Sequence, residues 1–332
     1  MTDATAVSWG LVAPVWVKRL SLLNVVVNVM IVITGGAVRL TGSGLGCPSW
    51  PNCAPGTFHT TPELGIHGAI EWGNRLFGVV VGIVAVATLL AAWFARPRRK
   101  SVVRMAFLVA IGVPAQALIG FVTVETGLNP WVVSCHFLVT IGVLAAAFTG
   151  WFRSREIEGP FEPVVPRQTR QLTLAVVWVT FAVITIGVIV TGSGPHAGDP
   201  ASPRIGLDPV QLSQAHADAV FLLLGFTVAL LFTLKSVKAP RNMVTAAWTL
   251  LAVELGQGLI GFVQLFTGLP ELLVGAHMLG AALLWLAALR VHLMGRTRLP
   301  IDDTPAHTPT QRTELIDVTA PVASLRRPSM TE

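Results

Sequence analysis

Long apolar runs separated by short polar segments dominate the chain. Eight runs are each about 20 residues long, which is the length that an α-helix needs to cross the roughly 30 Å hydrocarbon core of a bilayer. Because a helix satisfies its own backbone hydrogen bonds in lipid, each run predicts a membrane-spanning helix. The expected spans are 20–39, 74–95, 102–124, 131–152, 172–192, 211–234, 243–266 and 271–292.

The composition agrees with this pattern. Of the 332 residues, 53% are hydrophobic and 12% are charged, and the net charge is +6. A soluble globular protein has about 25% charged residues, so this chain lacks the polar side chains needed to cover a water-facing surface. The composition therefore excludes a soluble enzyme. It also excludes a disordered protein, which would combine low hydrophobicity with high charge.

The basic residues fall on one side of the predicted membrane. With a cytoplasmic N-terminus, 20 of the 23 Lys and Arg residues lie on the cytoplasmic side, and only Arg39, Arg75 and Arg204 lie outside. Because Lys and Arg are enriched in cytoplasmic loops, this distribution predicts that both termini are cytoplasmic. The positive charge thus reflects membrane topology, and we expect no nucleic-acid partner. The segment before the first span also lacks the pattern of a cleaved signal peptide.

Two sequence patterns occur twice. Gln116–Val122, together with His136, recurs as Gln257–Val263 with His277, and every matched position is shifted by the same offset. Thr41-Gly-Ser-Gly recurs as Thr191-Gly-Ser-Gly at a slightly larger offset. A unit of four spans appears twice, and an even number of spans gives both copies the same orientation.

The predicted fold is therefore an all-α polytopic membrane protein, with eight transmembrane helices arranged as two tandem four-helix bundles related by a parallel internal repeat. A buried site between facing helices is expected in each bundle. The segment after the last span is rich in Thr, Pro, Arg and Asp, which is typical of a disordered tail. The expected units are a cytoplasmic N-terminus 1–19, bundles 20–152 and 172–292, a cytoplasmic linker 153–171 and a cytoplasmic tail 293–332.

Three histidines lie at one depth inside predicted spans, one to two helical turns below the outer face: His136, His216 and His277. Polar residues inside spans are costly and are therefore functional candidates, although a histidine often only bonds a neighbouring helix. Two facing imidazoles about 4 Å apart can hold a heme iron from both sides. His216 and His277 belong to one bundle, so the sequence predicts that they form such a pair. The remaining histidines, His59, His196, His292 and His307, receive no metal role.

The first bundle lacks the matching pair. Carrying His216 back by the offset that relates His277 to His136 reaches Arg75, next to Asn74. His67 lies two helical turns before Asn74, either on an extended helix near Glu71 or in a loop. The two bundles are therefore expected to differ chemically, with a more open iron position in the first.

Glu71, at the outer end of the second span, has two interpretations. It lies one turn from Arg75 and can form a salt bridge at the membrane edge, or it can act as a proton donor or acceptor beside a reacting group. Arg39 and Arg75 both lie at span ends on the outer face. They are candidates for contacts with heme carboxylates, but side chains that only anchor a helix at the membrane edge would look the same.

Cys47 and Cys53 flank a short, proline-containing segment of the first outer loop. The outer face is oxidising and the loop is short, so we predict a disulfide. A redox-active or metal-binding pair is the alternative, although the spacing fits it poorly. Cys135 is expected to be a small buried residue.

Together these motifs resemble those of the heme A synthase family, in its actinobacterial form. The resemblance covers roughly residues 20–292 and is carried by Gly35–Cys53, Glu71-Trp-Gly-Asn-Arg75, the segments around His136 and His277, and Thr191–Asp199.

The resemblance implies that the chain oxidises the C8 methyl group of heme O to the formyl group of heme A through successive hydroxylations that use dioxygen. It implies a heme B cofactor on His216 and His277, substrate heme O near His136, and a catalytic role for Glu71. Much of the family has a histidine where this chain has Asn74. The partner of His136 is thus open between His67, Asn74, water and a vacant iron position.

The resemblance also implies a bacterial cell membrane location and a supply of heme O from heme O synthase, a farnesyltransferase. The membrane electron donor is not identified, and homo-oligomerisation is left open. A b-type cytochrome that takes electrons from quinol without modifying heme is the alternative, but it would be expected to have two complete histidine pairs. A transporter has only the parallel repeat in its favour.

Overall fold

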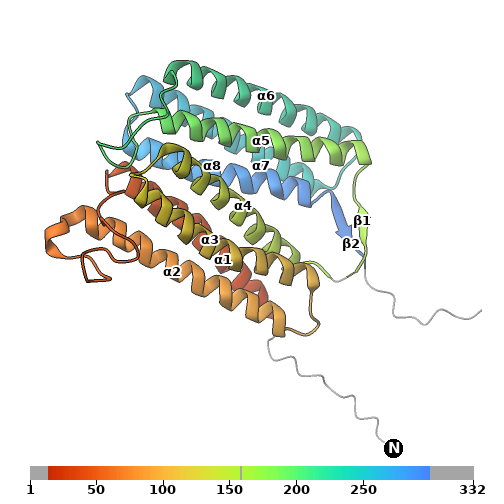
Figure 1. Ribbon diagram of the computed structural model, residues 1–332. Coiled ribbons are helices and arrows are strands. Elements are labelled where there is room, and N and C mark those ends of the chain that lie inside the picture. The colour runs from red at the N-terminus through yellow and green to blue at the C-terminus, as the bar shows by residue number, and fades with distance from the viewer. Residues whose placement is uncertain (1–13, 158, 300–332) are drawn as a thin grey trace, which may run out of the picture.

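The computed structural model describes residues 14–157 and 159–299, and eight long helices account for most of them (Figure 1). Each is long and apolar enough to cross a membrane. The prediction of an all-α polytopic membrane protein is confirmed. The helices are α1 Pro14–Leu40, α2 Gly65–Phe94, α3 Lys100–Glu125, α4 Pro130–Ser154, α5 Arg167–Ser193, α6 Pro209–Ser236, α7 Arg241–Phe266 and α8 Glu271–Leu293.

Several helices begin earlier than hydropathy predicts. The second span was expected from residue 74, but α2 begins at Gly65 after a short 3-10 turn, Pro62–Leu64. α4 and α6 begin at a proline, and the preceding Asn129 and Asp208 accept hydrogen bonds from backbone N–H groups of the first turn. Proline fits the first helical position, and Asn or Asp satisfies the free donors of that turn.

The helices pack in two groups of four. Helices α1–α4 contact one another in a ring, α5–α8 do the same, and α8 lies against α1 and α4 between the groups (Figure 1). The Trp285 indole donates a hydrogen bond across this boundary to the carbonyl of Ile141, at 3.0 Å. A methyl group on Gly36 would lie 3.3 Å from the Met278 methyl carbon, so α1 and α8 approach closely there. The internal repeat itself stays a prediction.

A small antiparallel sheet joins the linker between α4 and α5 to the segment that follows α8. Strand β1, Phe161–Pro163, pairs with β2, Arg296–Arg298. Glu156 holds this sheet to α4, because it accepts from Arg153 at 3.0 Å and from Arg298 at 3.2 Å. The boundary of the disordered tail at residue 293 is therefore wrong, and residues 300–332 lie outside the described part. The N-terminal boundary at residue 19 also changes, because α1 begins at Pro14.

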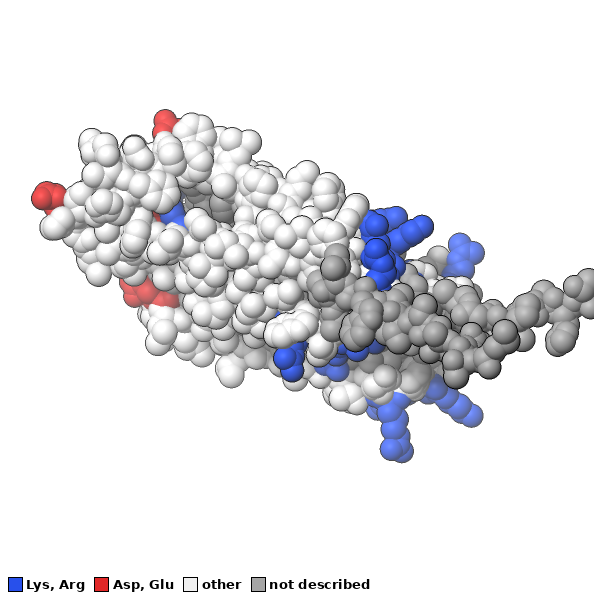
Figure 2. Space-filling view, turned by 90° about the horizontal axis from the view of Figure 1, so that it is seen from below, with Lys and Arg blue, Asp and Glu red and all other residues white. Residues whose placement is uncertain are grey.

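The two ends of the helix bundle differ in charge. Lys and Arg side chains gather at one end and acidic side chains at the other (Figure 2). We call the first the basic end; it includes Arg96–Lys100, the β1–β2 sheet and the α6–α7 turn. We call the second the loop end; it carries the long α1–α2 and α5–α6 connections. The candidate site lies toward the loop end.

Candidate functional site

A large cavity opens between the helices and is shared by both groups of four. Its volume is about 1950 Å³, and all eight helices line it. Typical small-molecule pockets are roughly 300–1,000 Å³, so this cavity has room for a very large ligand or for more than one. Most of its wall is apolar. The polar residues that line it include Asn28, Arg39, Glu71, Asn74, Arg75, Gln116, His136, His196, His216, Glu254, Gln257, Gln264 and His277.

His216 and His277 face each other across the C-terminal part of the cavity. They lie on α6 and α8, and their ring centroids are 6.4 Å apart with an angle of 71° between the planes. Glycines on neighbouring helices lie beside both rings. A methyl group on Gly187 would lie 2.9 Å from His216 Cε1, and one on Gly261 would lie 3.7 Å from His277 Cε1. The sequence prediction that these two histidines lie close together is met by the structure.

The spacing of the two rings fits ligation of a single metal ion. Two metal–nitrogen bonds of about 2 Å, plus about 1 Å from each nitrogen to its ring centre, separate the centroids by roughly 6 Å. Both Nδ1 atoms are buried and lack a hydrogen-bond partner among the described residues. Both rings also line the cavity, so a metal-bearing ligand in the cavity can reach them.

His136 occupies the matching place in the N-terminal part of the cavity. A methyl group on Gly120 of α3 would lie 3.5 Å from His136 Cε1, which parallels the contact of Gly261 with His277. Gln116 on α3 donates to the His136 carbonyl at 3.1 Å and to the Thr140 hydroxyl at 2.8 Å. The His136 Nδ1 atom is buried and has no partner among the described residues. His136 is thus held by its surroundings without a second histidine from the N-terminal group on the cavity wall.

Asn74 lines the same part of the cavity, whereas His67 does not. The Thr34 hydroxyl donates to Asn74 Oδ1 at 2.8 Å, which fixes the orientation of the amide. Of the two positions left open for His67, the structure has the extended helix: His67 lies on α2, and its Nδ1 is 2.9 Å from the Ser43 hydroxyl. Its partner is therefore the α1–α2 connection. The structure gives no support to His67 as a ligand inside the cavity.

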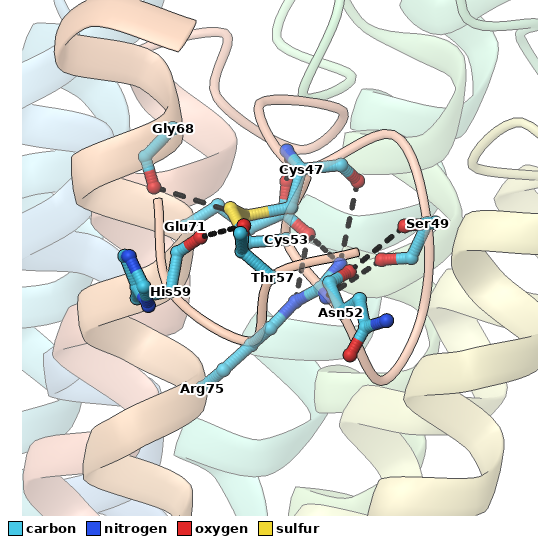
Figure 3. Close-up of a disulfide and its surroundings, with 9 residues drawn as sticks. All are labelled: Cys47, Ser49, Asn52, Cys53, Thr57, His59, Gly68, Glu71 and Arg75. Atoms are coloured by element: carbon cyan, nitrogen blue, oxygen red, sulfur yellow. Dashed lines mark hydrogen bonds and ion pairs between the residues drawn. A yellow bond between two sulfur atoms is a disulfide. The ribbon is translucent and has the colours of Figure 1, made fainter. Parts of the chain in front are cut away.

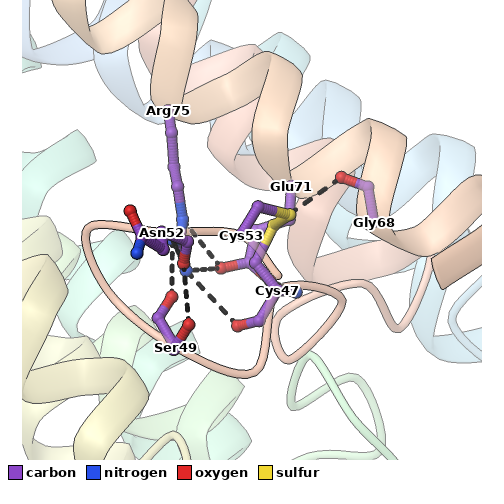
Figure 4. A network of polar contacts seen from close by, with 7 residues as sticks. All are labelled: Cys47, Ser49, Asn52, Cys53, Gly68, Glu71 and Arg75. Carbon is purple, nitrogen blue, oxygen red and sulfur yellow. Dashed lines mark hydrogen bonds and ion pairs between the residues drawn. A yellow bond between two sulfur atoms is a disulfide. The ribbon is translucent and has the colours of Figure 1, made fainter. Parts of the chain in front are cut away.

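Cys47 and Cys53 form the predicted disulfide, and Glu71 and Arg75 hold the loop that it closes (Figure 3). The Cys47 backbone N–H donates to Glu71 Oε2 at 2.7 Å. Arg75 forms an ion pair with Glu71 Oε1 at 2.6 Å. The same guanidinium donates to backbone carbonyls of Cys47, Ser49 and Asn52 (Figure 4). The loop therefore folds around one buried carboxylate–guanidinium pair.

These contacts decide what Arg75 can do. Its Nε and two terminal nitrogens carry five N–H donors, and the five hydrogen bonds to the loop and Glu71 engage them all. No donor is left for a heme carboxylate, so the expectation of such a contact is not supported at Arg75. Of the two interpretations of Glu71, the structure shows the salt bridge with Arg75. Glu71 is also 5% exposed and lies on the cavity wall, which keeps a chemical role open.

Arg39 links the two groups of helices. Its Nε donates to the His196 carbonyl at 2.7 Å, and one terminal nitrogen donates to the Thr191 carbonyl at 2.9 Å. Two of its five donors are used by these bonds, so Arg39 can still bind a carboxylate in the cavity that it lines. The His196 ring bonds the Leu269 carbonyl at 2.9 Å and is engaged in holding two connections together.

The sequence reasoning missed Glu254. It lies inside the predicted span 243–266, is 2% exposed, lines the cavity and accepts a hydrogen bond from Thr227 at 2.7 Å. An acidic residue in the middle of a span is itself a signal of function, and it was available in the sequence. Cys135 also differs from expectation, because it is exposed on the surface of α4.

Comparisons with known proteins agree with the motifs. A family model described as COX15-CtaA, cytochrome oxidase assembly protein, matches residues 18–198, which is more than half of the chain. The heme A synthase of Shouchella clausii is 25% identical over 285 residues, which cover 81% of this chain and 93% of that protein. Heme A synthases of Bacillus licheniformis and Listeria welshimeri are 28% and 27% identical over 120 and 122 residues. Those two matches cover 36% of this chain and only 39% and 40% of the relatives.

Proposed function

The chain belongs to the COX15-CtaA family of cytochrome oxidase assembly proteins, and we propose that it is a heme A synthase. Its reaction is the oxidation of the C8 methyl group of heme O to a formyl group by successive hydroxylations that use dioxygen. The Shouchella relative named heme A synthase aligns with most of this chain, which supports the proposal. The single observation that carries it is the arrangement of histidines on the wall of the shared cavity. His216 and His277 form a pair in the C-terminal part, and His136 lines the N-terminal part without a histidine partner from its own group of helices.

The C-terminal helices, within residues 172–292, hold heme B in this proposal. His216 and His277 would hold it, and their centroid separation of 6.4 Å supports that role. Bound there, heme B supplies one-electron storage beside the substrate. Gly187 keeps the space beside the His216 ring free, because a methyl group there would lie 2.9 Å from His216 Cε1. Arg39 retains donors toward the cavity and is the candidate partner of a heme carboxylate.

The N-terminal helices, within residues 20–152, receive heme O. His136 is its ligand, and Asn74 replaces the second histidine that much of the family has. Thr34 engages the carbonyl oxygen of the Asn74 amide, so the NH₂ group remains available as a hydrogen-bond donor. Asparagine is a poor ligand for heme iron. The substrate iron therefore keeps a position for dioxygen or water.

The disulfide loop covers the loop end of the substrate region. Trp50 and Pro51 from this loop line the cavity, and the Trp50 ring lies 5.4 Å from that of Phe121 on α3. Glu71 anchors the loop through its backbone and borders the cavity. We propose that the loop excludes water from the reacting methyl group and that Glu71 donates or accepts a proton there.

The basic end is cytoplasmic in this proposal, because 20 of the 23 Lys and Arg residues belong to that side. Both termini are then cytoplasmic, the chain lies in the bacterial cell membrane, and the heme region lies near the outer face. Heme O comes from heme O synthase. The alternative, a b-type cytochrome that only transfers electrons, loses support because the cavity wall carries one histidine pair and no second pair around His136.

Expression in a host that makes heme O tests the function. Hemes are extracted from membranes and identified by mass spectrometry. We expect the hydroxylated or formyl product with the wild-type chain and its loss with His136→Ala. Cys135→Ser is the matched control on the same helix, because this exposed side chain should not affect turnover. Product no higher than in an empty-vector host would refute the function.

A further inference from the structure

The carboxyl group of Glu254 is incompletely paired in the middle of the helix bundle. Glu254 is 2% exposed, and its Oε1 accepts a hydrogen bond from the Thr227 hydroxyl at 2.7 Å. Its Oε2 is buried and has no partner, and no salt bridge among residues 14–157 and 159–299 involves it. Burying a carboxyl oxygen without a hydrogen-bond partner costs free energy, so its presence inside a span suggests that a ligand binds it.

Packing of the helices does not require this carboxyl group. The offset in sequence that relates His277 to His136 relates Glu254 to Val113. The same offset relates Gln257 to Gln116, so the polar residue one turn away occurs in both halves. In the N-terminal half, the matching position is occupied by Val113, which has no carboxyl group. The acidic side chain is therefore a feature of the half that carries the histidine pair.

Glu254 lies deeper in the bundle than the histidines but on the same cavity. It is about 18 Å along α7 from the end of that helix at Phe266. His277 is only about 9 Å along α8 from the start of that helix at Glu271, at the loop end. Gly261, which contacts the His277 ring, lies two helical turns from Glu254 on the same face of α7. The carboxyl group is thus near the middle of a hydrocarbon core of about 30 Å.

Exposed apolar side chains form the cavity wall beside Glu254. Among the residues that line it are Phe221 on α6 and Leu255 and Leu259 on α7, and all three are exposed. Leu255 is the direct neighbour of Glu254. We infer that a lipid-soluble molecule enters past these apolar side chains and brings a polar group to the Glu254 carboxyl group, which lines the cavity.

We propose that Glu254 binds the head group of a membrane hydroquinone and that electrons enter the protein at this site. A hydroquinone combines a lipid-soluble body with hydroxyl groups that can pair with a carboxyl oxygen, and it is a two-electron donor. The inference rests on the proposed heme B at His216 and His277. Oxidation of one hydroquinone gives one quinone, two protons and two electrons. The heme takes the electrons one at a time, and the first passes on to the oxygen-dependent reaction before the second arrives. The first proton passes from the bonded hydroxyl to the Glu254 carboxylate, and the second leaves to water.

Reduction of the bound heme by a short-chain hydroquinone tests the proposal. Purified full-length protein with its heme is mixed anaerobically with decyl-hydroquinone, and reduction is followed by absorbance in a stopped-flow instrument. We expect Glu254→Leu to slow reduction roughly tenfold or more, because one hydrogen bond to the head group is lost. Dithionite should still reduce all the heme, and the spectrum should stay unchanged. Gln264→Leu, at another buried polar position of α7 on the cavity wall, should reduce at the wild-type rate. Equal rates for Glu254→Leu and wild type would overturn the proposal.

Photolabelling separates this inference from the proposed function. An azido-quinone is applied to the wild type, to His277→Ala and to Glu254→Leu, and the labelled peptides are identified by mass spectrometry. We expect label on the α7 peptide around residue 254 in the first two proteins and its loss in the third. Label spread over lipid-facing peptides, equal in all three, would contradict a quinone site. Labelling at residue 254 in a protein that binds no heme would keep the site and refute the heme proposal.

Discussion

The pair of Glu71 and Arg75 should control the stability of the disulfide loop. Replacing Arg75 by Met removes an ion pair with an N–O distance of 2.6 Å and three hydrogen bonds to loop carbonyls. It also leaves the Glu71 carboxylate with only the Cys47 N–H as partner. The side chains of Arg75 and Glu71 are 18% and 6% exposed, so solvent can replace little of what is lost.

Removing one partner of a buried ion pair costs about 3–5 kcal/mol. Because Arg75 is partly solvated, we take the lower end, about 3 kcal/mol, as the destabilisation of the folded loop. This corresponds to an increase of more than about a hundredfold in the opening equilibrium of the loop. Removing both charges in Glu71→Gln/Arg75→Met should cost less than Arg75→Met alone, because no unpaired carboxylate remains buried.

Hydrogen–deuterium exchange of the peptide covering residues 44–58 measures this effect. We expect fast exchange with Arg75→Met and partial recovery of protection in the double variant, which is the coupling that a double-mutant cycle reports. Arg98→Met is the matched control, because Arg98 lies over the Trp93 ring at the basic end and should not affect the loop. Unchanged exchange with Arg75→Met, or strictly additive effects in the double variant, would refute the reasoning.

Four further predictions concern the heme sites. His277→Ala should remove the tightly bound heme B spectrum, and a heme-to-protein ratio equal to wild type would exclude His277 as a ligand. Gly187→Val should also lower that ratio, because the added methyl groups meet the His216 ring, whereas Gly225→Val, which has open space around it, should not. Asn74→His should slow carbon monoxide binding to the substrate heme, and unchanged binding would argue that residue 74 does not face the iron. Glu71→Gln should keep heme B and reduce heme A formation, and full turnover would return Glu71 to a purely structural role.

Hydropathy predicted the eight helices because the bilayer leaves the chain few alternatives, but it could not set their ends. Residues Gly65 to Gly73 belong to α2, although His67 and Glu71 make this stretch too polar to count as part of the span. These polar groups are satisfied by Ser43 and by the disulfide loop, and such tertiary partners leave no local pattern. The pairing of Phe161 with Arg298 was hidden for the same reason, since the two short strands are far apart in sequence.

The part of the candidate site that could be predicted is the part for which residue type and depth in the membrane were enough to identify the residues. His216 and His277 lie at one level of α6 and α8, which face each other across the ring of helices α5–α8, and their shared depth in one bundle was enough to predict the pair. The role of Arg75 could not be predicted in this way, because it depends on where the loop directs its carbonyl groups. Glu254 could have been found from its position in a span. Its partner Thr227 could not, because pairing between helices depends on their rotation.

The most direct test of the account is the electron paramagnetic resonance spectrum of the purified ferric protein loaded with heme B and heme O. We expect two unequal hemes: a low-spin signal from the iron between His216 and His277, and a high-spin signal from the iron on His136. His277→Ala should remove the first signal and His136→Ala the second. Two low-spin signals in the wild type, or a spectrum that neither substitution changes, would contradict the claim that the two halves of this chain bind heme for different purposes.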